Sequence, residues 1–204
     1  VNKNGIRDAS GWRHNHCLSS PIYRDKTRSI NAQLAKRYKD HPALAFWHVG
    51  NEYSGDCHCE LCRSAFQGWL KKRYKTLDAL NNAWWSRFWN HTFTDWEQIQ
   101  TVDPSIDALQ LDWMRFVNDQ HISFILNEMI PLREFTPDVP CMTNFMGTHE
   151  GTNYWQWAEH VDIIANDLYP LPTNSADSWR YAIQSDFIHS LMRGMSGGKP
   201  WILL

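Results

Sequence analysis

Hydrophobic positions along the chain change between two kinds of pattern, and this alternation predicts four strands separated by helices. Short apolar runs with β-branched and aromatic members are typical of strands that are buried on both faces. Such runs occupy residues 43–49, 139–145, 161–168 and 200–204. Because helical patterns lie between them, we expect a parallel sheet with helices outside it.

Helical spacing of apolar residues accounts for most of the intervening segments. Ile30, Leu34 and Tyr38 recur four residues apart and Pro42 follows them, which predicts a helix over 24–39. Residues 1–23 are expected to form a loop. Further helices are expected over 62–74, 77–84 with Thr76 as N-cap, 105–135 with a candidate break at Pro131, 154–160 and 176–195.

Polar residues at the strand ends favour one of two α/β architectures. Gly50-Asn51-Glu52 follows the first predicted strand, Thr143-Asn144 ends the second and Tyr169-Pro170 ends the third. A (β/α)₈ barrel carries its functional groups at the C-terminal ends of its strands. A doubly wound sheet is expected to show a Gly-rich phosphate turn after its first strand instead. We therefore expect a partial TIM barrel, and four strands are half of one.

Composition and charge argue against several classes of function. The chain has 20 basic and 22 acidic residues with no basic stripe or acidic tail, so a role on nucleic acid or a membrane surface has no electrostatic support. No apolar run is long enough to span a bilayer. Twelve tryptophans fit either a large aromatic core or a sugar site, where rings pack on pyranose C–H faces. Both ends lack the features of natural termini, so we expect an internal piece of a longer protein.

Glu52 is the candidate catalytic group. A carboxylate at a strand end can be an ordinary solvated or ion-paired residue, and Asn-Glu is a common dipeptide. The neighbouring amide of Asn51 can, however, hydrogen-bond a sugar 2-hydroxyl, a contact that strengthens in the transition state of glycoside hydrolysis. A Glu beside it can protonate the leaving oxygen if its pKa is raised.

Three cysteines in six positions indicate a metal site. Cys57, Cys59 and Cys62 supply three ligands, whereas tetrahedral structural zinc takes four. Candidates for the fourth ligand are Cys17, Cys141, His14, His16 and His58. Cys141 lies in the middle of a predicted strand and is expected to be an ordinary buried thiol, so we choose Cys17, which lies in a loop. Free thiols and a disulfide are the competing interpretations, but a disulfide between the two cysteines of Cys-x-Cys would be strained.

Several segments together resemble glycoside hydrolase family 42, the β-galactosidases, over essentially the whole chain. They are HPALAFWHVGNEY, CHCELC, FQGWLKKRYKTLDALNNAWWSRFWN, DWEQIQ, LDWMRF, TNFMG and DLYP. The resemblance implies that residues 1–204 are part of one (β/α)₈ catalytic domain, about strands 4 to 7 with the preceding loop and helix. The N-terminal strands and two C-terminal domains would then be absent. It also implies a retaining enzyme with two catalytic carboxylates.

The resemblance assigns roles to individual residues. It makes Glu52 the general acid/base. It makes Arg13, Asn51, Trp89 and Tyr169 substrate-binding residues, and Cys17, Cys57, Cys59 and Cys62 the ligands of a structural zinc ion. The nucleophilic Glu is expected immediately after Leu204. Glu128, Glu134, Glu150 and Asp167 are poor candidates for that role. Two positions depart from the family pattern, Ser54 and His58, and His58 leaves the ligand set open.

The expected function is hydrolysis of terminal non-reducing β-D-galactose by double displacement, with the piece alone inactive. An α-L-arabinopyranosidase or β-fucosidase of the same fold is an alternative, because those sugars present similar hydroxyls. A non-catalytic carbohydrate-binding barrel or a zinc-stabilised interaction module is a further alternative from a different class. The resemblance also implies a homotrimer in the bacterial cytoplasm, with a galactoside as substrate.

Overall fold

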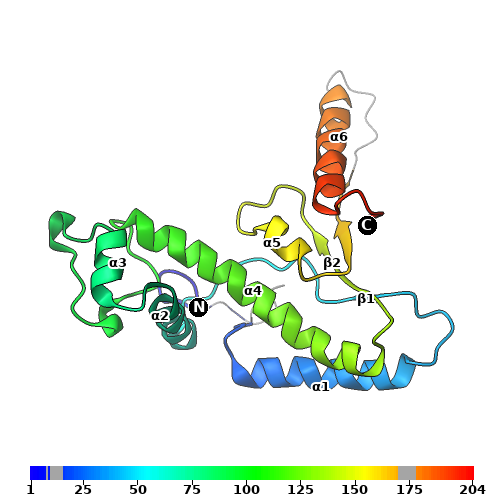
Figure 1. The fold of residues 1–204 in the computed structure, drawn as a ribbon, viewed down its shortest axis with the longest axis horizontal. Helices are drawn as coiled ribbons and strands as arrows, with labels where there is room; N and C mark the ends of the chain where they lie inside the picture. Colours follow the sequence, from blue (N-terminus) through cyan, green and yellow to red (C-terminus); the bar gives the residue numbers. More distant parts are fainter. Residues whose placement is uncertain (8, 10–15, 170–177) are drawn as a thin grey trace. The chain divides into compact units, whose positions relative to one another are not determined.

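A computed structural model describes residues 1–7, 9, 16–169 and 178–204 (Figure 1). The chain forms two compact units. The first, here called the cysteine unit, comprises Val1–Asp25 and Gly55–His121; the second, the sheet unit, comprises Lys26–Ser54 and Ile122–Leu204. Two helices, α1 (Pro21–Tyr38) and α4 (Asp107–Phe135), begin in the first unit and continue into the second.

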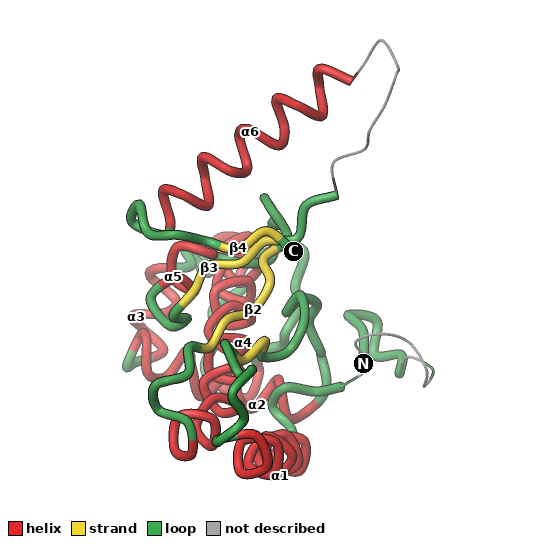
Figure 2. The backbone as a smooth tube through the Cα atoms, turned by 90° about the vertical axis from the view of Figure 1, so that its right-hand side faces the viewer, coloured by secondary structure: helices red, strands yellow, loops and turns green. Residues whose placement is uncertain are grey.

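The sheet unit contains a four-stranded parallel sheet in the order β1-β2-β3-β4. Its strands are β1 (Trp47–His48), β2 (Cys141–Phe145), β3 (Ile163–Asn166) and β4 (Ile202–Leu203). Figure 2 shows β2, β3 and β4 side by side. Strands that follow each other in chain order without reversal are typical of a barrel, whereas a doubly wound sheet reverses its order at a switch point. The predicted alternation of parallel strands with helices is confirmed.

The core of the sheet unit lies between the sheet and four helices. Two of these are α1 and α4, and the others are α5 (Tyr154–Ala158) and α6 (Ser178–Met195). The buried side chains include Ala35, Val49, Ile125, Met129, Leu132, Cys141, Phe145, Trp157, Ile164 and Met192. Tyr154 stacks on Phe145 with ring centroids 4.2 Å apart. This stacking holds the start of α5 against the end of β2.

The first predicted strand is much shorter than expected. Only Trp47 and His48 pair with β2, and Ala43, Ala45 and Phe46 are exposed rather than buried on both faces. The reason is that β1 lies at the edge of the described sheet, so one of its sides has no neighbouring strand. Of this run, Val49 is buried, in the core of the sheet unit.

Two helix predictions also need correction. Helix α1 begins at Pro21 rather than at residue 24, since proline is well tolerated in the first turn, where its missing N–H has no helical partner. Its predicted apolar stripe, Ile30, Leu34 and Tyr38, is exposed, and Ala35 is the buried residue. Helix α4 continues through Pro131 without a break. No helix among the described residues is long and apolar enough to cross a membrane.

The cysteine unit is built around aromatic side chains. Its helices are α2 (Glu60–Tyr74), α3 (Leu77–Ala83), the 3₁₀ turns η1 (Phe88–Asn90) and η2 (Trp96–Gln98), and the first half of α4. Phe66 packs edge-on against Trp113 at 5.1 Å between centroids and in a tilted arrangement against Phe116 at 5.4 Å. Thr76 caps α3 as predicted, because its side chain accepts a hydrogen bond from the Ala79 N–H.

Candidate active site and cysteine cluster

The turn that follows β1 carries Glu52 in an uncommon backbone conformation. Gly50 has φ +62°, and a Cβ at this position would lie 2.2 Å from the Tyr53 hydroxyl oxygen, so the position requires glycine. Glu52 itself has φ +46°, in the left-handed region that residues other than glycine rarely adopt. The Ser54 hydroxyl donates to the Glu52 carbonyl at 2.9 Å. A strained residue of this kind persists only where its surroundings hold it.

Tyr53 anchors this turn to helix α4. Its hydroxyl donates to the carboxylate of Glu128, which is buried. Its ring packs against Trp157 at 5.2 Å and Phe124 at 6.3 Å between centroids. Glu128 belongs to the part of α4 that lies in the sheet unit, so the contact ties the turn to the core beneath it. From the sequence, Glu128 was considered only as a poor candidate for the nucleophile, and its contact with Tyr53 was not predicted.

Asn144, the fourth residue of β2, connects the strand ends. Its Oδ1 accepts from the Glu52 backbone N–H at 2.9 Å and lies 3.1 Å from His48 Nε2. Its Nδ2 donates to Asn51 Oδ1 at 3.1 Å and to Asp167 Oδ2 at 2.8 Å. Asn51 Nδ2 in turn donates to Glu52 Oε2 at 3.3 Å. The ends of β1, β2 and β3 thus share one hydrogen-bonded network.

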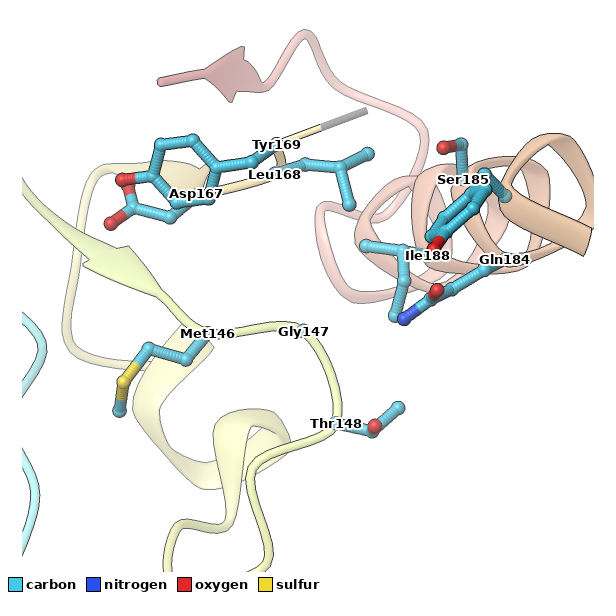
Figure 3. A pocket seen from close by; sticks show the side chains of 10 residues that line it. Met146, Gly147, Thr148, Asp167, Leu168, Tyr169, Gln184, Ser185 and Ile188 are labelled. Carbon is cyan, nitrogen blue, oxygen red and sulfur yellow. The ribbon is translucent and has the colours of Figure 1, made fainter. Parts of the chain in front are cut away.

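An open cavity of about 270 Å³ lies beside this network, between the loops after β2 and β3 and helix α6. Figure 3 shows Asp167 and Tyr169 on one side of it and Gln184 and Ile188 on the other. The hydroxyl and amide groups in its lining, including those of Thr148, Gln184 and Tyr169, are suited to hydrogen bonds with a hydroxylated ligand.

Tyr154 supports the loop that follows β2. Its hydroxyl accepts a hydrogen bond from the Met146 N–H at 2.9 Å. Burial raises the pKa of Tyr154 to about 12, and the negative charges of Glu52 and Asp167 add to the effect. The phenol is therefore neutral at physiological pH and serves as part of the scaffold.

The predicted substrate-binding residues are distributed over both units. Asn51 and Glu52 are brought together at the end of β1. Tyr169 follows β3, also in the sheet unit, and is 76% exposed. Trp89 belongs to the cysteine unit, where it is 77% exposed and has φ +54°. Arg13 lies outside the described residues.

The four predicted cysteine ligands converge in the cysteine unit. Their Sγ atoms all lie within 4.8 Å of one another, and Cys17 Sγ is 3.5 Å from Cys59 Sγ and 3.4 Å from Cys62 Sγ. A tetrahedral site with metal–sulfur bonds of about 2.3 Å has sulfur–sulfur edges of about 3.8 Å. The thiols are not joined in disulfides, so the four can hold one metal ion. Cys141 is a buried free thiol in the other unit, as predicted.

Hydrogen bonds within the cluster divide the thiols into donors and acceptors. The hydrogen bond with Cys17 lowers the pKa of Cys62 to about 5, and hydrogen bonds with Ser19 and Gln120 contribute to the same shift. The hydrogen bond to Cys62, together with burial, raises the pKa of Cys17. The lowered pKa of Cys62 favours its thiolate, the form of cysteine that binds metals.

His58 stands between the cysteines in the sequence, and its ring nitrogens have partners other than the sulfur atoms. Its Nε2 lies 2.9 Å from Asp56 Oδ2 and its Nδ1 lies 2.9 Å from Thr101 Oγ1, while its ring stacks on Trp113 at 4.8 Å. The hydrogen bond from His58 lowers the pKa of Asp56. Both ring nitrogens thus have partners that hold the cysteine loop against the aromatic core.

Comparisons with known proteins agree with this architecture. The family model for β-galactosidase, glycoside hydrolase family 42, matches residues 1–204. The chain is 49% identical to β-galactosidase BglY of Alicyclobacillus acidocaldarius and 48% identical to β-galactosidase GanA of Bacillus subtilis; all of the chain is matched, against 30% and 32% of those proteins. The structure of a cold-adapted β-galactosidase from Rahnella sp. R3 superposes with a TM-score of 0.91 at 47% identity, covering 95% of this chain and 29% of that one.

The chain therefore spans about a third of the length of the relatives that it matches. Its four parallel strands with their helices are part of a TIM barrel. Because the family model covers every residue, the chain belongs to the glycoside hydrolase family 42 β-galactosidases.

Proposed function

We propose that the complete protein is a retaining β-galactosidase in which Glu52 is the general acid/base. The observation that carries the proposal is the position of Glu52: in a chain of the β-galactosidase family, it follows a parallel strand, in a strained turn, beside a hydrogen-bonded amide. Relatives named β-galactosidases are up to 49% identical to this chain. The strands β1 to β4 would be strands 4 to 7 of the barrel.

In the proposed mechanism, Glu52 first protonates the departing glycosidic oxygen and later takes a proton from the attacking water. A nucleophilic carboxylate about 5–5.5 Å away is required for retention. We propose that it is a Glu immediately after Leu204, because β4 is paired with β3 there and barrel enzymes place catalytic groups at strand ends.

Substrate recognition is proposed to involve Asn51, Arg13, Trp89 and Tyr169. The Asn51 amide nitrogen lies 3.3 Å from Glu52 Oε2, so a sugar hydroxyl near the acid/base is within its reach. Such a contact to the 2-hydroxyl strengthens as the transition state forms. The proposed substrate is a terminal β-galactoside. A homotrimer is proposed from the family resemblance, and light scattering of the complete protein tests it.

The cysteine cluster is proposed to hold a structural zinc ion through Cys17, Cys57, Cys59 and Cys62. The fit of the four sulfur atoms to a tetrahedral site supports this assignment. Four protein ligands leave no open position for a water molecule, so the ion would stabilise the fold and take no part in hydrolysis. Metal analysis is expected to find about one zinc per chain, and metal-free protein prepared without chelators would contradict the assignment.

The leaving-group dependence of Glu52→Gln tests the acid/base role. In the complete enzyme, turnover of galactosides with basic leaving groups is expected to fall by about 10³-fold, within the range for general acid catalysis, whereas activated aryl galactosides stay partly reactive. Equal loss across all leaving groups would contradict the role. A panel of nitrophenyl glycosides with the wild-type enzyme is expected to give the highest kcat/KM for β-galactoside, ahead of α-L-arabinopyranoside and β-fucoside.

A further inference from the structure

We infer that Asn144 is a positioning residue that holds both Glu52 and Asn51 in their working orientations; this rests on the proposed function of Glu52. Asn144 is 3% exposed, and its side chain contacts His48 of β1, Asn51 and Glu52 of the turn after β1, and Asp167 at the end of β3. Both lone pairs of its oxygen and both hydrogens of its nitrogen are engaged, which is the full hydrogen-bonding capacity of an amide.

The partners of Asn144 determine which way its amide faces. The Glu52 backbone N–H is a donor, so the atom facing it must be the amide oxygen. The Asp167 carboxylate is an acceptor, so the atom facing it must be the amide nitrogen. These two contacts give the same orientation. The oxygen also faces His48 Nε2, which must then carry a hydrogen.

The orientation of the Asn144 amide also determines the orientation of the Asn51 amide. Because Asn144 Nδ2 donates to Asn51 Oδ1, the NH₂ group of Asn51 is turned toward Glu52 Oε2. Asn51 needs this donor group on the substrate side in order to hydrogen-bond a sugar hydroxyl. Its own side chain is exposed, so no surrounding core fixes its rotamer. Asn144 supplies that constraint from a buried strand.

The second task of Asn144 is to stabilise the backbone of Glu52. The left-handed conformation at Glu52 is unfavourable for a residue with a side chain. Its N–H is held at 2.9 Å by the Asn144 oxygen, within the normal range for a strong hydrogen bond. Loss of this contact lets the turn relax, and the carboxylate would move away from the scissile bond.

Asn144→Asp in the complete enzyme tests the inference. The new carboxylate has the same shape but cannot donate to Asn51 or Asp167, and it places a second negative charge beside Asp167. Titratable groups of the described residues surround the new carboxylate. They are His48 and Glu52 at β1, Asp167 at β3, Tyr154 of α5 and, through Tyr53, Glu128 of α4. The added negative charge beside Glu52 is expected to alter the pH dependence of acid catalysis.

The expected result is a fall of about 10²-fold in kcat/KM for galactosides with basic leaving groups and a smaller fall for activated ones, since acid catalysis contributes about 10²–10⁴-fold. The basic limb of the pH profile is expected to move to higher pH. Asn144→Ser removes both donors without adding charge, so it is expected to show the same leaving-group pattern without the shift of the basic limb.

Thr143→Val is the matched control. Thr143 precedes Asn144 in the same strand and is equally buried, and its hydroxyl has no hydrogen-bond partner in the part of the chain that the structure describes. Its replacement is expected to leave the pH profile and leaving-group dependence unchanged. If Asn144→Asp does not fold, Asn144→Ser carries the test alone through its leaving-group pattern.

Uniform loss across leaving groups in the Asn144 variants, equal to that of Thr143→Val, would overturn the inference. If the proposed function itself is wrong, Glu52→Gln is also expected to leave the leaving-group dependence unchanged. If Glu52→Gln shows the expected pattern and the Asn144 variants do not, the positioning role alone is wrong.

Discussion

The two units of the chain differ in how their candidate sites are assembled. In the cysteine unit, four thiols from two segments meet within 4.8 Å, and they form the whole proposed ligand set. In the sheet unit, the turn with Glu52 is anchored on several sides, yet a retaining glycosidase needs a second carboxylate. A metal site can be completed by a few neighbouring loops, whereas a barrel active site collects residues from many strand ends. Under the proposed function, the described residues contain all four proposed metal ligands and the proposed acid/base Glu52.

The strongest test of this contrast is removal of one sulfur ligand. Cys62→Ser in the complete protein is expected to abolish zinc binding and to destabilise the cysteine unit by about 5 kcal/mol or more, because the binding energy of a structural zinc ion contributes directly to folding. Zinc content by elemental analysis and thermal unfolding measure both effects. The control is Cys141→Ala, which removes a buried thiol outside the cluster and is expected to keep the zinc. Full zinc occupancy in Cys62→Ser would show that the cluster is not the metal site.

The next largest effect is expected at Asp112, a buried carboxylate of the cysteine unit. It accepts hydrogen bonds from the Tyr74 hydroxyl at 2.5 Å, the Trp84 indole N–H at 2.9 Å and Arg115 at 2.9 Å. Asp112→Ala leaves these donors without their acceptor and is expected to cost about 3–5 kcal/mol of stability. Chemical denaturation measures the loss.

Asp119→Ala is the control for this variant, because Asp119 accepts from Trp69 at 2.8 Å but is only half-buried. Its cost is expected to be about 1 kcal/mol. The kcat of folded enzyme should stay unchanged in both variants, because neither Asp112 nor Asp119 is a proposed catalytic or substrate-binding residue. Equal costs for Asp112 and Asp119 would contradict the assigned importance of the buried carboxylate.

A smaller effect is expected at alkaline pH in the sheet unit. The pKa of Tyr154 is raised from 10 to about 12, so its contribution to stability is complete below about pH 10 and is lost as the pH rises from about 10 to about 12. Two pKa units correspond to about 2.7 kcal/mol. Tyr154→Phe is expected to weaken the alkaline loss of stability, measured by denaturation between pH 8 and 12. Tyr181→Phe, at a more exposed phenol, should behave like wild type; identical alkaline curves for the Tyr154 variant and wild type would contradict the assignment.

Local patterns in the sequence predicted much of the fold. The helices, the order of the strands and the cap at Thr76 depend on short-range spacing and propensity, which are visible in one sequence. The cysteine cluster was predictable because three of its members lie in six positions. The exposure of the segment around β1 was not predictable, because it depends on which strands flank the segment and not on its own apolar content.

The long-range contacts at the site could not be predicted from the sequence. Asn144 was noted at a strand end, but its contact with Glu52 joins residues 92 positions apart, and Tyr53 meets Glu128 across 75 positions. No spacing rule connects such residues. The pairing of His58 with Asp56 and Thr101 likewise depends on the folded aromatic core and could not be predicted from the sequence.

The role of Glu52 is tested most directly by the product that a small replacement variant forms with azide. In Glu52→Ala of the complete enzyme, an activated aryl galactoside can still form the covalent intermediate, and azide can enter the space that Glu52 occupied. We predict restored turnover with β-galactosyl azide as product, because azide then attacks from the face of the acid/base. An α-galactosyl azide would identify Glu52 as the nucleophile, and no azide effect would show that Glu52 has neither role.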